Sequence, residues 1–136
     1  MKSSKLLRNQ EGFTLVEIIA VLIILGILAA VAVPRYIDLE ANARQRAIDA
    51  GISELNVRES LTWADAKISI TGYSDDATLF PEVNYTLGDD YSWGAGGGGA
   101  RPTVADGANV LVFRDTTEVT ITRNASTPSQ PATWTR

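Results

Sequence analysis

The 136-residue chain contains neither cysteine nor histidine, and these two absences exclude much of protein chemistry. Without them there is no thiol nucleophile, no serine–histidine pair, no thiolate or imidazole metal site and no side chain that titrates near neutral pH unaided. Sixteen acidic residues against twelve basic ones give a net charge of −4. This charge argues against direct binding to nucleic acid, which needs clustered lysine and arginine. The composition therefore favours a non-catalytic protein, and we predict no cofactor and no metal.

Charge and hydropathy are distributed unevenly along the chain. Residues 1–12 carry a net charge of +2, so the remaining residues carry −6. Every residue from 18 to 33 is apolar or Gly26. Residues 13–33 would form roughly 30 Å of helix, which matches the hydrocarbon core of a bilayer. A basic start before such a run predicts one membrane span with a cytoplasmic N-terminus. A cleaved secretory signal or a buried core helix fits less well, because the run is long and no small-x-small cleavage site ends it.

Glu17 lies inside this apolar segment, between Val16 and Ile18. An ionised carboxylate at membrane depth costs at least ~3 kcal/mol unless something compensates for it. Glu17 is therefore a candidate functional residue. The alternative is an interfacial position, from which the side chain reaches water. Position alone does not decide between these two interpretations.

The most specific signal is the stretch of residues 5–17, which reads KLLRNQEGFTLVE. It combines a basic leader that ends in Gly12, an aromatic residue at Phe13, and Glu17 directly before the apolar run. This combination resembles the precursors of the type IV pilin and pseudopilin family. The resemblance covers residues 5–36, and beyond them it is only architectural.

The resemblance implies a role for each of these residues. A membrane-embedded prepilin peptidase would cut between Gly12 and Phe13 and then methylate the new amine of Phe13. Glu17 would meet the N-terminal amine of a neighbouring subunit in a helical filament. Wrong registers would be rejected, because an unmatched buried charge costs several kcal/mol. Gly26 and Pro34 would mark a segment that kinks or melts, since glycine disfavours helix and proline lacks an amide hydrogen.

Beyond Pro34 the pattern predicts an α+β fold, in which the long N-terminal helix packs on a small antiparallel sheet. Apolar residues at spacings of three, four or seven predict that the helix continues in amphipathic form to about Trp63. The residues of this stripe expected to face the core are Ile48, Ile52 and Leu55. Strands are predicted at residues 83–87, 91–93, 110–113 and 118–123. Alternation in the last strand and a short connection before it predict a hairpin within a three- or four-stranded sheet.

These assignments predict four parts of the chain. They are a leader at 1–12 that is removed, an apolar membrane and polymerisation helix at 13–35, an amphipathic helix half at 36–63 and a β-sheet head at 64–136. Residues 124–136 are predicted to be an irregular tail, held in place by Trp134.

Two motifs in the head are better explained by turns and loops than by ligand binding. Residues 94–99 formally fit GxGxxG, but no helix follows them, so we predict a flexible loop. The aspartate pairs at 75–76 and 89–90 are predicted to be solvated turns rather than a calcium site, because their spacing matches no calcium loop.

Asn84 is a candidate glycosylation site. Residues 82–86 match the bacterial pattern acidic-x-Asn-x-Thr, and residues 124–126 match the minimal pattern Asn-x-Ser. Patterns this short also occur by chance.

Together these features predict the structural subunit of a type IV pilus, not an enzyme. Its predicted partners are further copies of itself in a helical filament, prepilin peptidase and the inner-membrane assembly machinery. It would begin as a single-pass inner-membrane precursor and end in an extracellular pilus. One alternative is a major-type pseudopilin in the periplasmic pseudopilus of a type II secretion system. A membrane-anchored binding module is a further alternative, but it would leave the Gly12–Phe13 junction and Glu17 unexplained.

Overall fold

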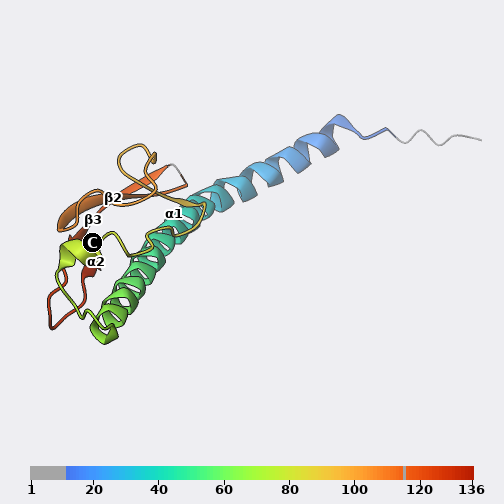
Figure 1. Ribbon diagram of the computed structural model, residues 1–136. Helices are drawn as coiled ribbons and strands as arrows, with labels where there is room; N and C mark the ends of the chain where they lie inside the picture. Colours follow the sequence, from blue (N-terminus) through green and yellow to red (C-terminus); the bar gives the residue numbers. More distant parts are fainter. Residues whose placement is uncertain (1–11, 115) are drawn as a thin grey trace, which may run out of the picture. The chain divides into compact units, whose positions relative to one another are not determined.

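The computed structural model describes residues 12–114 and 116–136 (Figure 1). The predicted leader therefore lies outside the described residues, apart from Gly12. The chain divides into two compact units, one ending at residue 40 and one formed by residues 41–136. Helix α1 (Leu15–Ile68) contributes to both units.

In the first unit the chain is helical from Leu15 onward. The helix runs through Gly26 and Pro34 without interruption in its assignment. The predicted melting between these residues concerns a filament, and it stays a prediction for the isolated chain.

In the second unit α1 buries one stripe of side chains. The buried residues recur every three or four positions, as expected for one face of a helix, and they are Ile48, Gly51, Ile52, Leu55 and Glu59. The predicted core residues of the helix are thus confirmed. Position 51 leaves little room for a side chain, because a Cβ there would lie 3.0 Å from the ring of Tyr91, which would have to shift.

The helix ends at Ile68, five residues beyond the predicted end at about Trp63. Residues 64–67 favour helix, and Trp63 adds a tertiary contact, because its Nε1 donates to the Thr127 carbonyl at 2.9 Å. The turn that follows the helix contains Gly72, whose φ is +70°. Glycine adopts this left-handed conformation without a Cβ penalty.

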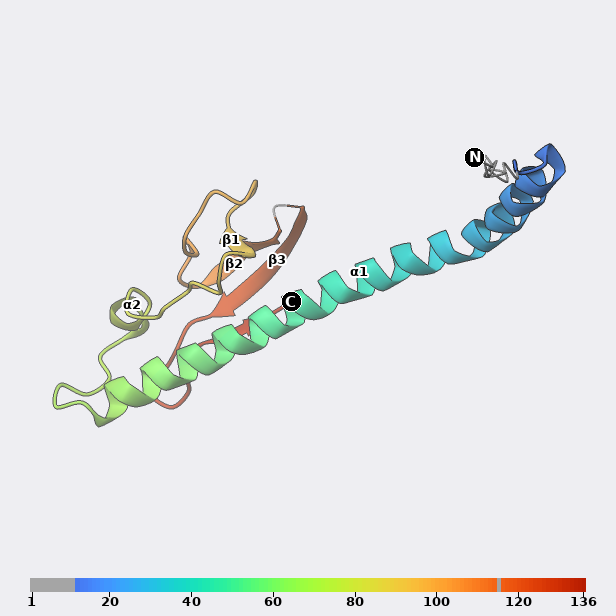
Figure 2. The same cartoon turned by 90° about the vertical axis from the view of Figure 1, so that its right-hand side faces the viewer.

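Four antiparallel strands form one sheet in the order β1-β2-β3-β4 (Figure 2). They are β1 (Tyr91–Trp93), β2 (Gly107–Phe113), β3 (Thr117–Asn124) and β4 (Thr133–Thr135). The predicted hairpin is confirmed, with Val110 opposite Thr120. The prediction of a wholly irregular tail was wrong, because β4 pairs Trp134 with Arg123. Three residues after two prolines are too short a strand to recognise from periodicity.

Residues 83–87 were predicted to be a strand, and this was wrong. The segment alternates between buried and exposed residues as an extended chain does, but side chains take the place of a neighbouring strand. Arg58 donates to the carbonyls of Asn84 and Thr86 at 2.9 and 2.7 Å. The Trp93 indole donates to the Tyr85 carbonyl at 3.1 Å.

Aromatic rings form the centre of the core between α1 and the sheet. The Trp93 and Trp134 rings lie 5.4 Å apart, and the Tyr85 ring meets each of them nearly edge-on at 6.1 Å. Tilted and edge-on pairs suit the charge distribution of aromatic rings. The other buried residues of this core are Ile48, Ile52, Leu55, Val83, Leu111 and Ile121.

A charged cluster lies within the same core, and we call its five residues the Arg123 cluster. Arg123 is fully buried and donates to both carboxylate oxygens of Glu59, at 2.6 and 2.9 Å. It also donates to both oxygens of Asp76, at 2.7 and 3.1 Å. The Tyr85 hydroxyl and the Trp134 indole donate to Glu59 at 3.1 and 3.0 Å. The guanidinium therefore ties α1 to strand β3 and to α2 (Asp76–Leu79).

The Arg123 cluster corrects the prediction that residues 75–76 form a solvated turn. Asp75 caps α2 by accepting from the Thr78 amide at 2.8 Å, and the Asp76 side chain is only 14% exposed. Burial raises the pKa of Asp76, but hydrogen bonds from Arg123 and Ser126 outweigh it, so the pKa lies below its usual value. Burial and the nearby Glu59 raise the pKa of Tyr85 well above its usual range.

Candidate functional site in the N-terminal segment

Gly12 and Phe13 precede α1 in non-helical conformation. A Cβ added to Gly12 would meet no described atom within 4 Å, and the same holds for Gly26. Neither glycine has a φ in the left-handed region that favours the residue. The described fold therefore gives no reason for glycine at either position.

Thr14 and Glu17 together start helix α1. The Thr14 hydroxyl accepts a hydrogen bond from the Glu17 amide at 3.2 Å, and the Thr14 carbonyl accepts from the Ile18 amide at 3.2 Å. Thr14 is thus the N-cap, with Glu17 three residues later as in a capping box. The Glu17 carboxylate also lies in the first turn, where the helix dipole favours negative charge. Sequence reasoning missed this local role, although Thr-x-x-Glu before an apolar run is its signature.

Apolar side chains of this segment have no cover in the first unit. Phe13 is 79% exposed, Val16 is 74% exposed, and even Ile19 is 46% exposed. The segment lies in the one helix of the described chain that is long and apolar enough to cross a membrane. A continuous apolar surface of this kind marks a membrane or protein contact.

Glu17 therefore combines two properties. Its carboxylate lies among exposed apolar side chains, and no ion-pair partner for it is present among residues 12–114 and 116–136. Once apolar material covers this surface, the carboxylate would lose its water and need a compensating group.

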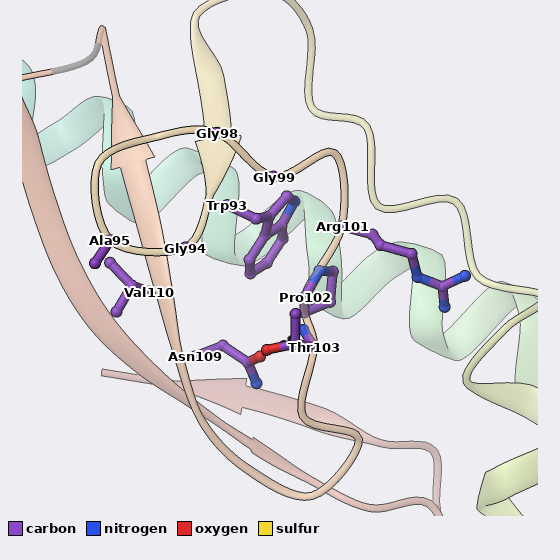
Figure 3. Close-up of a pocket in the computed structure, with 10 residues that line it drawn as sticks. All are labelled: Trp93, Gly94, Ala95, Gly98, Gly99, Arg101, Pro102, Thr103, Asn109 and Val110. Atoms are coloured by element: carbon purple, nitrogen blue, oxygen red, sulfur yellow. Dashed lines mark hydrogen bonds between the residues drawn. The ribbon is translucent and has the colours of Figure 1, made fainter.

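The glycine-rich residues 94–99 form a loop that doubles back on Trp93. The Trp93 amide donates to the Gly99 carbonyl at 2.8 Å, and the Gly99 amide donates to the Trp93 carbonyl at 2.7 Å. A hollow of about 250 Å³ lies beside this loop (Figure 3). The Arg101 side chain points away from the hollow and donates to the Phe80 carbonyl at 3.1 Å. The sequence prediction of a flexible loop at residues 94–99 stays a prediction.

In the described part of the chain, no three histidine, cysteine, aspartate or glutamate residues gather in a group that could hold a metal ion. Asp90 instead pairs with Arg114 at 3.0 Å on the surface. Asn84 is exposed in the second unit.

The geometry defines a class of protein, one with an α+β head and an exposed apolar helix that is capped by Thr14 and carries Glu17 in its first turn. The model of the prokaryotic N-terminal methylation motif matches residues 7–33. The type IV narrow pilus major component PilA5 of Thermus thermophilus is 40% identical over 82 residues, which are 60% of this chain and 69% of that protein. Fimbrial protein Q of Moraxella bovis is 32% identical over 116 residues, 74% of this chain and 72% of that protein.

A third relative, the type IV major pilin protein PilA of Myxococcus xanthus, is 28% identical over 71% of this chain and 43% of its own length. No solved structure shows significant similarity. The chain belongs to the type IV pilin family. It is a structural protein rather than an enzyme.

Proposed function

We propose that this chain is the major subunit of a type IV pilus. It is made as a single-pass inner-membrane precursor, cut between Gly12 and Phe13, methylated on the Phe13 amine and polymerised through residues 13–35. The observation that carries the proposal is the uncovered apolar surface that starts at Phe13. The match to the methylation motif over residues 7–33 supports it. Pilus and fimbrial relatives favour a pilus over the pseudopilus of a secretion system.

Gly12 supports cleavage at this junction because the described fold does not need glycine there. An enzyme that binds the junction in an extended form would need it, since glycine lets the backbone approach without a Cβ clash. The same reasoning applies to Gly26, whose Cβ position is also open. Its requirement would arise in the filament, where the helix between Gly26 and Pro34 would loosen.

Glu17 supports assembly through charge. In a bundle of apolar helices its carboxylate would be buried, and the amine of Phe13 in a neighbouring subunit would be buried too. Each charge relieves the desolvation cost of the other. This pairing selects the register of docking rather than adding net stability, because every other register leaves a charge unpaired.

The proposed parts of the chain follow from the same scheme. The leader 1–12 is removed, residues 13–35 lie in the membrane and later in the filament core, and the amphipathic half at 36–63 carries the head at 64–136. The precursor has its N-terminus in the cytoplasm and its head in the periplasm. Its partners are prepilin peptidase, the inner-membrane assembly machinery and further copies of itself.

Mass spectrometry of the membrane-purified protein tests this proposal. We expect a chain that starts at Phe13 with one extra methyl group on its amine. Gly12→Val should block cleavage by placing a branched Cβ in the peptidase cleft. Gly26→Val is the matched control, because it makes the same change at a second open glycine and should be processed normally. A native chain that still starts at Met1, or normal cleavage of Gly12→Val, would contradict the proposal.

A further inference from the structure

Residues 82–86 form an extended segment of the head whose side chains alternate between core and solvent. Val83 and Tyr85 are only 5% and 3% exposed, whereas Glu82, Asn84 and Thr86 are exposed. Alternate residues of an extended chain point to opposite sides. The acidic residue, the asparagine and the threonine of the acidic-x-Asn-x-Thr pattern are therefore presented together on the solvent side.

The backbone of this segment is held from the core side. Arg58 on α1 binds the carbonyls of Asn84 and Thr86, and Trp93 binds the carbonyl of Tyr85. The two buried side chains anchor the segment at either side of Asn84. The outer side is thus displayed in a defined conformation without being covered.

The Asn84 side chain adopts an arrangement suited to reaction at its nitrogen. Its Oδ1 accepts a hydrogen bond from the Thr86 amide at 3.0 Å, which is an Asx turn. Within the described residues, neither the Asn84 Nδ2 nor the Thr86 hydroxyl takes part in a hydrogen bond. Both groups that an acceptor site must offer to an enzyme are therefore available.

The Asn-x-Ser pattern at residues 124–126 provides an internal comparison. Asn124 lies at the end of β3, and its Nδ2 donates to the Thr133 hydroxyl at 3.4 Å. The hydroxyl of Ser126 donates to Asp76 at 2.7 Å, and Ser126 is only 8% exposed. Thr122, not an acidic residue, lies two positions before Asn124. The side chains of Asn124 and Ser126 are thus engaged in hydrogen bonds within the fold, whereas the Asn84 Nδ2 and the Thr86 hydroxyl are not.

We propose that Asn84 is an acceptor for N-linked glycosylation. The donor is an oligosaccharide linked to a polyprenyl pyrophosphate, and the catalyst is a membrane-bound oligosaccharyltransferase. The Asn84 Nδ2 attacks the anomeric carbon, so that an N–C bond forms and the C–O bond to the pyrophosphate breaks. Polyprenyl pyrophosphate leaves, and the amide proton passes to a basic group of the transferase. Glu82 supplies a negative charge for a cation of the transferase, and Thr86 supplies the hydroxyl.

This inference rests on the proposed function, because the head must reach the periplasm to meet such a donor. The full precursor is therefore expressed with a flexible acidic-x-Asn-x-Thr tag added after Arg136. A bacterial oligosaccharyltransferase that reads this pattern and its lipid-linked oligosaccharide are supplied in the same cells, with a separate exported acceptor protein. The tag reports whether the head has reached the transferase, and tryptic glycopeptides report which asparagine is modified.

We expect a glycopeptide at Asn84 and none at Asn124. Asn84→Gln, Glu82→Gln and Thr86→Ala should each abolish modification at residue 84, whereas Thr86→Ser and the control Asn124→Gln should retain it. These exposed substitutions leave the buried anchors intact. A modified tag with an unmodified Asn84 would overturn the inference and leave the proposed membrane topology standing. An unmodified tag beside a modified separate acceptor would overturn both.

Discussion

The first unit and the second unit each place a glutamate among apolar side chains, but they compensate for it differently. Glu59 in the second unit is buried, and its carboxylate is held by Arg123, Tyr85 and Trp134 of the same chain. Glu17 in the first unit has only its position at a helix start, and the apolar residues around it are exposed. The head is thus complete within one chain. The apolar segment is complete only when another molecule covers it.

Removal of the apolar segment should have the largest effect, because it takes away the part of the chain that needs another molecule to cover it. A fragment that begins at Asp38 should leave the membrane fraction entirely and behave as a monomer, because the core of residues 41–136 is internal to that unit. Size-exclusion chromatography with light scattering measures this. If the fragment formed filaments unaided, polymerisation would have to be assigned to the head.

Breaking the Arg123 cluster is the next largest test. Arg123→Ala leaves Glu59 buried without its partner, and removing one partner of a buried pair costs about 3–5 kcal/mol. The free energy of unfolding is measured by tryptophan fluorescence of the full chain in detergent, since all three tryptophans lie in the second unit.

Arg114→Ala is the matched control for Arg123→Ala. Arg114 also pairs with an aspartate, but both side chains are more than half exposed, so the loss should stay below about 1 kcal/mol. Equal effects of the two substitutions would contradict the role assigned to burial.

Lowering the pH should moderately reduce the free energy of unfolding of the head, because Asp76 has a lowered pKa in the folded chain. Its pKa is lower in the folded chain than in the unfolded one, so its stabilisation is complete above the unfolded pKa and is lost as the pH falls through the folded value. Unfolding by urea at pH 7 and at pH 3 measures the difference. Asp76→Asn should reduce the difference without abolishing it, because the capping residue Asp75 also has a lowered pKa. If Asp76→Asn left the difference in unfolding free energy between pH 7 and pH 3 unchanged, Asp76 would be excluded as a cause of the pH dependence.

The sequence predicted the helical stripe and the central hairpin because both depend on local periodicity. Ile48, Ile52 and Leu55 repeat at helical spacing, and Ile121 alternates with exposed threonines. The Arg123 cluster was not predictable in this way, because Glu59 and Arg123 are 64 residues apart in the chain. No local pattern distinguishes them from solvated charges.

The predicted strand at 83–87 failed for a related reason. Its alternation was read correctly, but alternation reports burial and not the hydrogen-bond partner of the backbone. Here that partner is the Arg58 side chain. In the N-terminal segment, position alone left the role of Glu17 open, and the Thr14 cap became visible only in the structure.

Two substitutions separate the two possible roles of Glu17, which are charge pairing in the filament and initiation of the helix. Glu17→Gln keeps a residue that suits a capping box and removes the charge, whereas Thr14→Ala removes the cap and keeps the charge, at a cost of about 1 kcal/mol to the helix. Both variants should be cleaved and should reach normal membrane levels, as immunoblots would show.

Filament number in sheared surface fractions, counted by electron microscopy, is the deciding measurement. Glu17→Gln should abolish filaments or nearly do so, because the buried amine of the neighbouring Phe13 then lacks its partner. Thr14→Ala should assemble filaments at close to the normal level. Normal filaments from Glu17→Gln, together with their loss in Thr14→Ala, would show that Glu17 serves only to start the helix.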